Sequence, residues 1–148
     1  MANKPSLKVA GTWATIQAAA SVGAGAISGG TRTTIAAALT TGDEADYAKL
    51  DMMLTHSAGS TPAVNELVHV FRRSKADGTN ESPVPSSTFR QEHVGSFVLQ
   101  ALAAPQYYYL YGITNEDKNA TYYLMNDAAS ATMTLALSAR GAALDTPA

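Results

Sequence analysis

Residues 47–56 read YAKLDMMLTH, and this stretch decides the fold class of the chain. Every second residue is apolar, so that four side chains share one face of an extended strand: Ala48, Leu50, Met52 and Leu54. The residues between them fall on the opposite face: Tyr47, Lys49, Asp51 and Met53. Strict alternation of this kind is typical of a half-buried antiparallel strand, which has one face in a core and the other in solvent.

Comparable short segments recur along the chain and are separated by turn-rich loops. We predict extended segments at residues 13–18, 31–39, 47–56, 66–74, 92–102, 106–113, 121–125 and 132–139. For the first segment, an alanine-rich helix over residues 14–20 is the competing interpretation, because alanine favours helices and is poor in strands. About eight strands is the number found in a jelly roll of two packed sheets. The sequence therefore predicts an all-β, jelly-roll-like β-sandwich of about eight antiparallel strands.

We divide the chain into an extended N-terminal arm, a β-sandwich domain and a loose C-terminal tail: residues 1–11, 12–140 and 141–148. The arm is polar, contains Pro5 and shows no periodicity. Within the domain, residues 77–80 (DGTN) predict a tight turn. The irregular stretch around Pro83 and Pro85 predicts a long loop, and such loops on rigid scaffolds often make contacts.

Composition limits the classes of partner. The 148 residues include no cysteine, which excludes thiol catalysis and disulfide bonds. With 10 basic and 12 acidic residues the formal net charge is -2, so we expect no direct binding to nucleic acid or to an anionic membrane. No secretory signal pattern and no run of about 18 apolar residues is present, and we expect synthesis in the cytoplasm. Only 15% of residues are charged, against about 25% in a typical domain, which predicts a surface that is neutral or partly covered by other copies.

The three histidines, His56, His69 and His93, lie on different predicted strands or strand ends. They lack the i, i+2 or i, i+4 spacing that metal sites often show, so we expect no metal and no cofactor. A serine, a histidine and a carboxylate could meet by chance in any sandwich of this size, and the sequence distinguishes no such set. We therefore predict no catalytic residue and expect that the chain is not an enzyme.

Six of the seven tyrosines are concentrated in residues 107–111 and 122–123, and a predicted hairpin at residues 115–119 places all six in one patch. Because side chains alternate along a strand, three of them share one face: Tyr107, Tyr109 and Tyr111. Three interpretations stay open, namely aromatic pairing within the sheet, a protein interface, and stacking on a carbohydrate.

A basic cluster, Arg72, Arg73 and Lys75, lies at the end of the strand predicted at residues 66–74. It could bind a phosphate group or pair with acidic residues of another copy. A solvated strand end is the third interpretation and the commonest arrangement for such a cluster.

Residues 47–80 contain a strand (YAKLDMMLTH), a loop of small residues (SAGSTPA), a second strand (ELVHVFRRS) and the turn DGTN. Together with the later aromatic strands and the final strand MTLALSA, this succession resembles the small β-sandwich decoration (cement) proteins of tailed bacteriophages. The resemblance extends over residues 30–139. It implies a protein on the capsid surface of the virion that binds the major capsid protein after shell expansion, often as a homotrimer. It also implies extended termini that bridge neighbours, and it brings no catalytic residue.

The expected function is therefore that of a non-enzymatic structural protein of a phage virion, made in the host cytoplasm, that decorates and cements the capsid. The expected partners are the major capsid protein and further copies of the chain, with a trimer favoured. The expected interface residues lie in the arm, the basic cluster, the loop and the tyrosine segment: Lys4, Pro5, Leu7, Lys8, Arg72, Arg73, Pro83, Pro85, Tyr107, Tyr109 and Tyr111.

Other classes remain. A tail or head-to-tail connector component of the virion would share the same sequence features. A carbohydrate-binding module would need two or more of the three same-face tyrosines to be exposed and coplanar. An enzyme of the cupin or hydrolase type would need a convergent polar pocket, and the scattered histidines make this class the least favoured.

Overall fold

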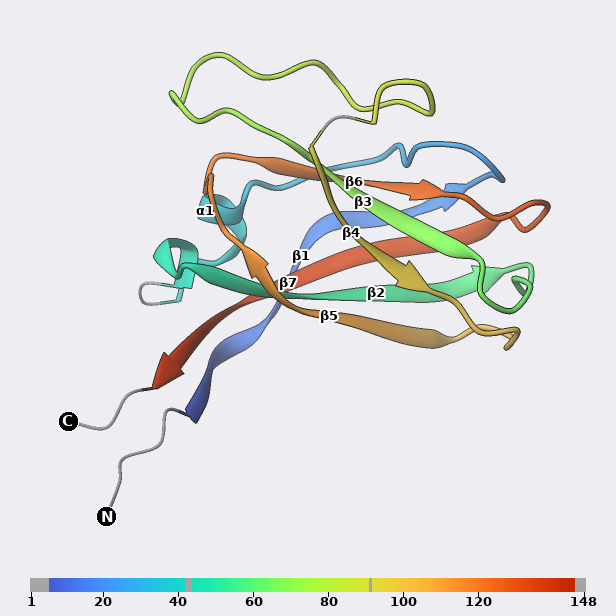
Figure 1. The fold of residues 1–148 in the computed structure, drawn as a ribbon, viewed down its shortest axis with the longest axis horizontal. Helices are drawn as coiled ribbons and strands as arrows, with labels where there is room; N and C mark the ends of the chain where they lie inside the picture. The colour runs from blue at the N-terminus through green and yellow to red at the C-terminus, as the bar shows by residue number, and fades with distance from the viewer. Residues whose placement is uncertain (1–5, 42–43, 91, 146–148) are drawn as a thin grey trace.

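The computed structural model describes residues 6–41, 44–90 and 92–145, which form two antiparallel β-sheets packed face to face (Figure 1). The strands are β1 (Ser6–Val22), β2 (Lys49–Gly59), β3 (Leu67–Arg73), β4 (His93–Val98), β5 (Gln106–Thr114), β6 (Thr121–Asn126) and β7 (Met133–Asp145). Two short helical turns lie between β1 and β2: α1 (Ile35–Ala38) and the 3-10 helix η1 (Glu44–Asp46). The predicted all-β sandwich is confirmed.

Within the described residues, sheet A contains four strands in the order β1-β7-β2-β5, and sheet B contains three in the order β4-β3-β6. All neighbouring strands are antiparallel. Strand β2 lies inside sheet A, where it pairs with β7 on one side and with β5 on the other. The described part of the chain has seven strands where about eight were expected, because one predicted strand does not form.

That strand, expected at residues 31–39, is replaced by an isolated bridge and one helical turn. Arg32 makes a single bridge to β1. The Thr34 hydroxyl then accepts a hydrogen bond from the Ala37 amide at 3.2 Å, which caps the start of α1. Three alanines follow Ile35 and favour a helical turn over a strand, while the Ile35 side chain is buried in the core.

The core lies between the sheets and is built on the alternation that the sequence predicts for β2. Leu50, Met52 and Leu54 are fully buried. They share one cluster with side chains of sheet B and of β7: Val68, Val70, Phe97, Leu124, Leu135 and Leu137. Because each such side chain stabilises the fold by about 1.5–3 kcal/mol when it is buried, this face of β2 is a main source of stability.

The two ends of the described chain pair with each other. β2 pairs with β7 as far as Lys49↔Ala142, and beyond it the pairs Ser6↔Asp145, Leu7↔Leu144 and Lys8↔Ala143 continue sheet A as a two-stranded ribbon toward both chain ends (Figure 1). This corrects the expected domain boundaries after residues 11 and 140, because the backbone groups on both sides of each boundary belong to β1 and β7. The helix considered for residues 14–20 is wrong, since these residues are also part of β1.

Strands β5 and β6 do not form the hairpin expected at residues 115–119. β5 pairs with β2 in sheet A, and β6 pairs with β3 in sheet B, so the connection crosses from one sheet to the other. The Asn115 side-chain amide fixes the start of this crossing by donating to the carbonyls of Ala45 and Tyr47, both at 2.9 Å. The burial of Tyr122 explains the separation, because its ring belongs to the core between the two sheets.

The turn predicted at residues 77–80 is confirmed. Gly78 has a φ of 75°, and an Asp77 carboxylate oxygen accepts from the amides of Asn80 at 2.7 Å and Thr79 at 2.8 Å. These hydrogen bonds lower the pKa of Asp77, because they favour its ionised form.

Substitution of Leu54 by alanine should reduce the free energy of unfolding by about 2–5 kcal/mol, because it leaves a cavity in the core. Thr55→Ala is the matched control, since Thr55 is the next residue of β2 and lies on the partly exposed face. Urea unfolding of both variants measures the difference. Equal losses for the two variants would contradict the assignment of the two faces of β2.

Candidate functional site

The outer face of sheet A, which points away from the core, carries an exposed row of tyrosines on β5. Tyr107, Tyr109 and Tyr111 are 55%, 46% and 62% exposed. Tyr108 and Leu110 point the other way and pack against the core. The predicted alternation is confirmed, and these three rings therefore lie on the protein surface.

Trp13 of β1 extends this row. Its ring centroid lies 5.8 Å from that of Tyr109, and the Tyr109 ring stacks on Tyr111 with centroids 6.1 Å apart and planes 11° apart. Both distances are within the range of favourable aromatic pairs. We call Trp13, Tyr107, Tyr109 and Tyr111 the aromatic face. The sequence did not predict that Trp13 joins the tyrosines, because β1 and β5 are far apart in the chain.

A buried ion pair supports the aromatic face. Asp51 of β2 accepts from Arg140 Nε at 3.2 Å and from the Gly112 amide at 3.3 Å, one hydrogen bond to each carboxylate oxygen. The Arg140 guanidinium in turn lies over the Trp13 ring, 4.3 Å from its centroid. Asp51 is only 1% exposed, and removing a carboxylate from water is costly unless it is paired in this way. The ion pair therefore fixes Trp13 relative to β2 and β5.

The other tyrosines of the expected patch do not join the aromatic face. Tyr122 and Tyr123 lie on β6 in sheet B and are buried. Burial raises the pKa of the Tyr122 hydroxyl to about 12, and the Arg32 guanidinium lies 3.6 Å from the centroid of the Tyr123 ring. The expected single patch of six tyrosines is wrong, because two of them pack within sheet B and Tyr108 faces the core.

The basic cluster at the end of β3 is paired within the chain. Arg72 Nη2 lies 3.0 Å from Glu116 Oε2, and Arg73 Nη1 lies 2.5 Å from Glu81 Oε2. Lys75 Nζ lies 3.9 Å from the other oxygen of Glu81. Because each positive charge has an acidic neighbour in the same chain, the geometry favours a structural role for this cluster over binding of phosphate or of another copy.

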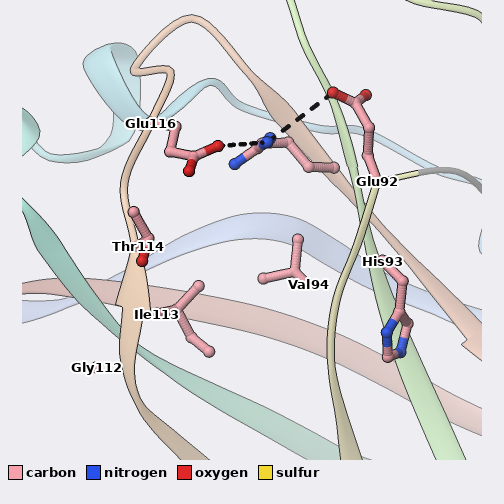
Figure 2. Close-up of a pocket in the computed structure, with 8 residues that line it drawn as sticks. Glu92, His93, Val94, Gly112, Ile113, Thr114 and Glu116 are labelled. Carbon is pink, nitrogen blue, oxygen red and sulfur yellow. Dashed lines mark hydrogen bonds and ion pairs between the residues drawn. The ribbon is translucent and has the colours of Figure 1, made fainter.

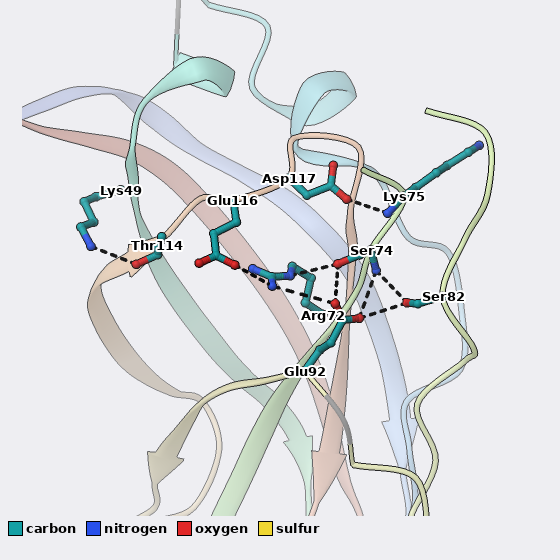
Figure 3. A network of polar contacts seen from close by, with 9 residues as sticks. All are labelled: Lys49, Arg72, Ser74, Lys75, Ser82, Glu92, Thr114, Glu116 and Asp117. Carbon is teal, nitrogen blue, oxygen red and sulfur yellow. Dashed lines mark hydrogen bonds and ion pairs between the residues drawn. The ribbon is translucent and has the colours of Figure 1, made fainter. Parts of the chain in front are cut away.

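Glu92 is the centre of a hydrogen-bond network beside this cluster (Figure 3). Its carboxylate accepts from the hydroxyls of Ser74 at 2.6 Å and Ser82 at 3.0 Å, and it lies 3.9 Å from Arg72 Nη2. Partial burial raises the pKa of Glu92, but these hydrogen bonds and the Arg72 charge outweigh that effect, and the net result is a lowered pKa. The network ties the loop that follows β3 to the start of β4.

A cavity of about 320 Å³ opens between β4 and β5 beside Arg72 (Figure 2). Its wall combines polar and apolar side chains: Glu92, Glu116, His93, Thr114, Val94 and Ile113. The Arg72 guanidinium contacts both glutamates, so its single positive charge offsets one of their two negative charges and the wall remains negative. The cavity has room for a small polar molecule.

The other expected interface residues lie on different elements or outside the described residues. Two of them pair with β7 as part of β1, and two lie outside the described residues: Leu7 and Lys8 in the first case, Lys4 and Pro5 in the second. In the loop after the DGTN turn, Pro83 is exposed whereas Pro85 is buried. Among the expected residues that the structure describes, the three tyrosines on β5 share one exposed face.

The histidines lie in two places. His56 continues the buried face of β2, and burial lowers its pKa. His69 and His93 meet on the outer face of sheet B with ring centroids 5.2 Å apart, and Ser96 and Asp127 form hydrogen bonds with His69. Sequence spacing did not indicate this cluster, because it arises from the pairing of β3 with β4 and β6. Within the described residues, no group of three or more histidine, aspartate or glutamate side chains could bind a metal ion.

None of the helices in the described ranges has the length and apolar character needed to cross a membrane. Comparisons of the chain with protein-family models, curated proteins and solved structures give no match.

Replacing Glu92 by glutamine should reduce stability at neutral pH, and the difference from the wild type should shrink in acid. The pKa of Glu92 is lowered in the folded state, so its contribution is present above the unfolded-state pKa of about 4.3 and is lost as the pH falls through the folded-state pKa. Urea unfolding between about pH 7 and about pH 3 measures this dependence.

Glu116→Gln is the matched control, because Glu116 also contacts Arg72 but its side chain is 63% exposed. Exposed ion pairs contribute little, so this variant should change the pH dependence less. An effect of Glu116→Gln as large as that of Glu92→Gln would contradict the central place of Glu92 in the network.

Proposed function

We propose that this chain is a structural protein of a bacteriophage virion that decorates the capsid by packing its aromatic face against the major capsid protein. The observation that carries the proposal is the exposed pair Tyr109 and Tyr111, with the half-buried Trp13 packed beside Tyr109, on one face of sheet A. The resemblance of the sequence to phage decoration proteins supplies the partner.

The composition and rigidity of the aromatic face support a protein interface. Tryptophan, tyrosine and arginine are the residues most enriched among those that dominate binding energy, and here Trp13 and the tyrosines lie beside Arg140. Their strands belong to one sheet, and the Asp51–Arg140 ion pair limits their movement. A surface that is already ordered loses less conformational entropy on binding.

The geometry of the rings favours this function over sugar stacking. The Tyr109 and Tyr111 centroids are 6.1 Å apart, so the two rings already pack on each other and leave no space for a sugar ring between them. Decoration at many equivalent sites on a shell also suits a chain with few charges, since neutral surfaces can be covered by neighbours. In this proposal the protein is made in the host cytoplasm, assembles as a trimer on the capsid surface and has no catalytic role in decoration.

A carbohydrate-binding module is the second candidate. Its specific support is that Tyr109 and Tyr111 are both exposed and nearly parallel, as this function requires. A sugar would then stack on an outward ring face rather than between the rings. A tail or head-to-tail connector component would use the same aromatic face against a different virion protein.

The double variant Tyr109→Ala/Tyr111→Ala should weaken binding to expanded, undecorated phage shells by about 30-fold or more, because truncation of a central interface aromatic costs about 2 kcal/mol or more. Cosedimentation of the purified protein with the shells at increasing concentration measures this affinity. Val98→Ala is the control, since Val98 is similarly exposed, at 55%, but lies on β4 in sheet B.

Three results would count against the proposal. Wild-type protein that stays in the supernatant with the shells, or a double variant that pellets as well as the wild type, would contradict capsid binding through the aromatic face. Specific retention on a glycan array that is lost in the double variant would support the carbohydrate-binding module instead.

A further inference from the structure

The outer face of sheet B, on the opposite side of the sandwich from the aromatic face, brings a serine, a histidine and an aspartate into one line of hydrogen bonds. Ser96 Oγ lies 2.6 Å from His69 Nδ1, and His69 Nε2 lies 3.1 Å from Asp127 Oδ2. His69 and Ser96 are register partners on β3 and β4, and Asp127 directly follows β6. The Asp127 backbone is fixed as well, because its amide donates to the Leu67 carbonyl at 2.9 Å.

The proton positions in this line follow from the partners. An ionised carboxylate only accepts hydrogen bonds, so the Asp127 partner, His69 Nε2, carries the ring proton. Nδ1 of the neutral ring then has a free lone pair and accepts the hydroxyl proton of Ser96. A nucleophile bonded to a base, and a base oriented by a carboxylate, are the relations that define a catalytic triad; here the two ring nitrogens are exchanged relative to the serine protease arrangement.

A second histidine contacts the same hydroxyl. His93 Nε2 lies 3.0 Å from Ser96 Oγ, and because the single hydroxyl proton is directed to His69, His93 is the donor in this bond. Partial burial and the neighbouring His69 lower the pKa of His93, which keeps its ring neutral near neutral pH. Its N–H group is therefore placed to donate to an oxygen that gains negative charge on a molecule attached to Ser96.

A cavity of about 230 Å³ opens beside the two histidines that contact Ser96. It is lined by His69, Phe71, Arg90 and His93, so that two of its wall residues form hydrogen bonds with Ser96. Phe71 supplies an apolar wall and Arg90 a positive charge. The volume is below the roughly 300–1,000 Å³ of sites for drug-sized ligands, which suits a short acyl group.

We propose that Ser96 is a nucleophile, activated by His69, that accepts the acyl group from esters of short carboxylic acids. Ser96 Oγ attacks the carbonyl carbon while its proton passes to His69 Nδ1. The bond from that carbon to the leaving oxygen then breaks, and the alcohol departs with this proton. Water attacks the acyl-serine with His69 as base, which releases the carboxylic acid and restores the hydroxyl.

Asp127 is a positioning residue in this reaction, because it orients the His69 ring and stabilises its positive charge without touching the ester. The activity goes beyond capsid decoration and does not depend on it, since the Ser96 site and the aromatic face lie on opposite outer faces of the sandwich. It also departs from the expectation that the chain has no catalytic residue.

The test is to label the full-length protein with a fluorophosphonate probe, which exchanges fluoride for a serine oxygen, and to locate the label by peptide mass spectrometry. We expect one label, on Ser96, and none in Ser96→Ala. His69→Gln should slow labelling by about 100-fold or more, the usual contribution of a general base. Ser138→Ala is the control, because Ser138 is a half-buried serine on the outer face of sheet A and its loss should leave labelling unchanged. Release of nitrophenol from p-nitrophenyl acetate should follow the same order.

Substitutions of Asp127 separate the orientation of His69 from a purely structural effect. Asp127→Ala removes the hydrogen-bond partner of His69 Nε2, so labelling of the folded variant should slow. Asp127→Glu keeps a carboxylate that can accept from His69 Nε2, and it should restore part of the labelling rate. A structural role alone would give the two folded variants the same rate.

Thermal unfolding of each variant verifies that it is folded. Failure of the folded wild type to label at Ser96 faster than at Ser138 would overturn the proposal. So would labelling of a folded His69→Gln variant at the wild-type rate, or equal labelling rates for the folded Asp127→Ala and Asp127→Glu variants.

Discussion

The two-residue alternation of side chains along β2 is the constraint on which the rest of the structure depends, because β2 pairs with both β7 and β5. One face packs Leu50, Met52 and Leu54 into the core, and the other supplies Asp51 to the ion pair with Arg140. A slip of one residue would move the apolar set out of the core and the carboxylate into it. The register of β5 and β7, and with it the position of each ring on the aromatic face, is therefore fixed by β2.

The same constraint makes the aromatic face a rigid surface. Asp51 is buried and yet has both oxygens bonded, to Arg140 and to the Gly112 amide, so breaking either contact would leave a buried charge incompletely paired. Arg140 extends this linkage to the Trp13 ring. Exposed aromatic side chains that are ordered before binding are well suited to a protein interface, which is why the capsid-binding proposal is placed on sheet A. The outer face of sheet B has different chemistry, with polar and titratable groups around Ser96.

Features set by local patterns could be predicted from the sequence, and features set by strand pairing could not. The alternation in β2, the common face of the β5 tyrosines and the turn at residues 77–80 depend only on neighbouring residues. The prediction of a strand at residues 31–39 was wrong because the Thr34 cap and the following alanines form a helical turn. The prediction of a tyrosine hairpin was wrong because β6 pairs with β3 and not with β5. This pairing allows the Tyr122 ring to be buried between the sheets.

In the candidate sites, too, the contacts that depend on strand pairing could not be predicted from local sequence patterns. Trp13 meets Tyr109 although β1 and β5 are the two edge strands of sheet A, and no local signal in the sequence indicates that contact. The hydrogen-bonded set on sheet B, Ser96, His69 and Asp127, forms only when β3 is paired in register with both β4 and β6. The spacing of these residues along the chain does not indicate it. The available signal was that His69 and Ser96 are polar residues flanked by apolar residues of their strands, since outward positions on two paired strands can face each other.

The central claim is that the aromatic face of sheet A contacts the capsid, and a cryo-electron microscopy reconstruction of an expanded phage shell saturated with the protein tests it most directly. The account predicts that sheet A lies toward the shell, with Trp13 and the β5 tyrosines buried against the major capsid protein. A shell without bound protein, or bound protein with those rings in solvent and another surface in contact, would contradict it.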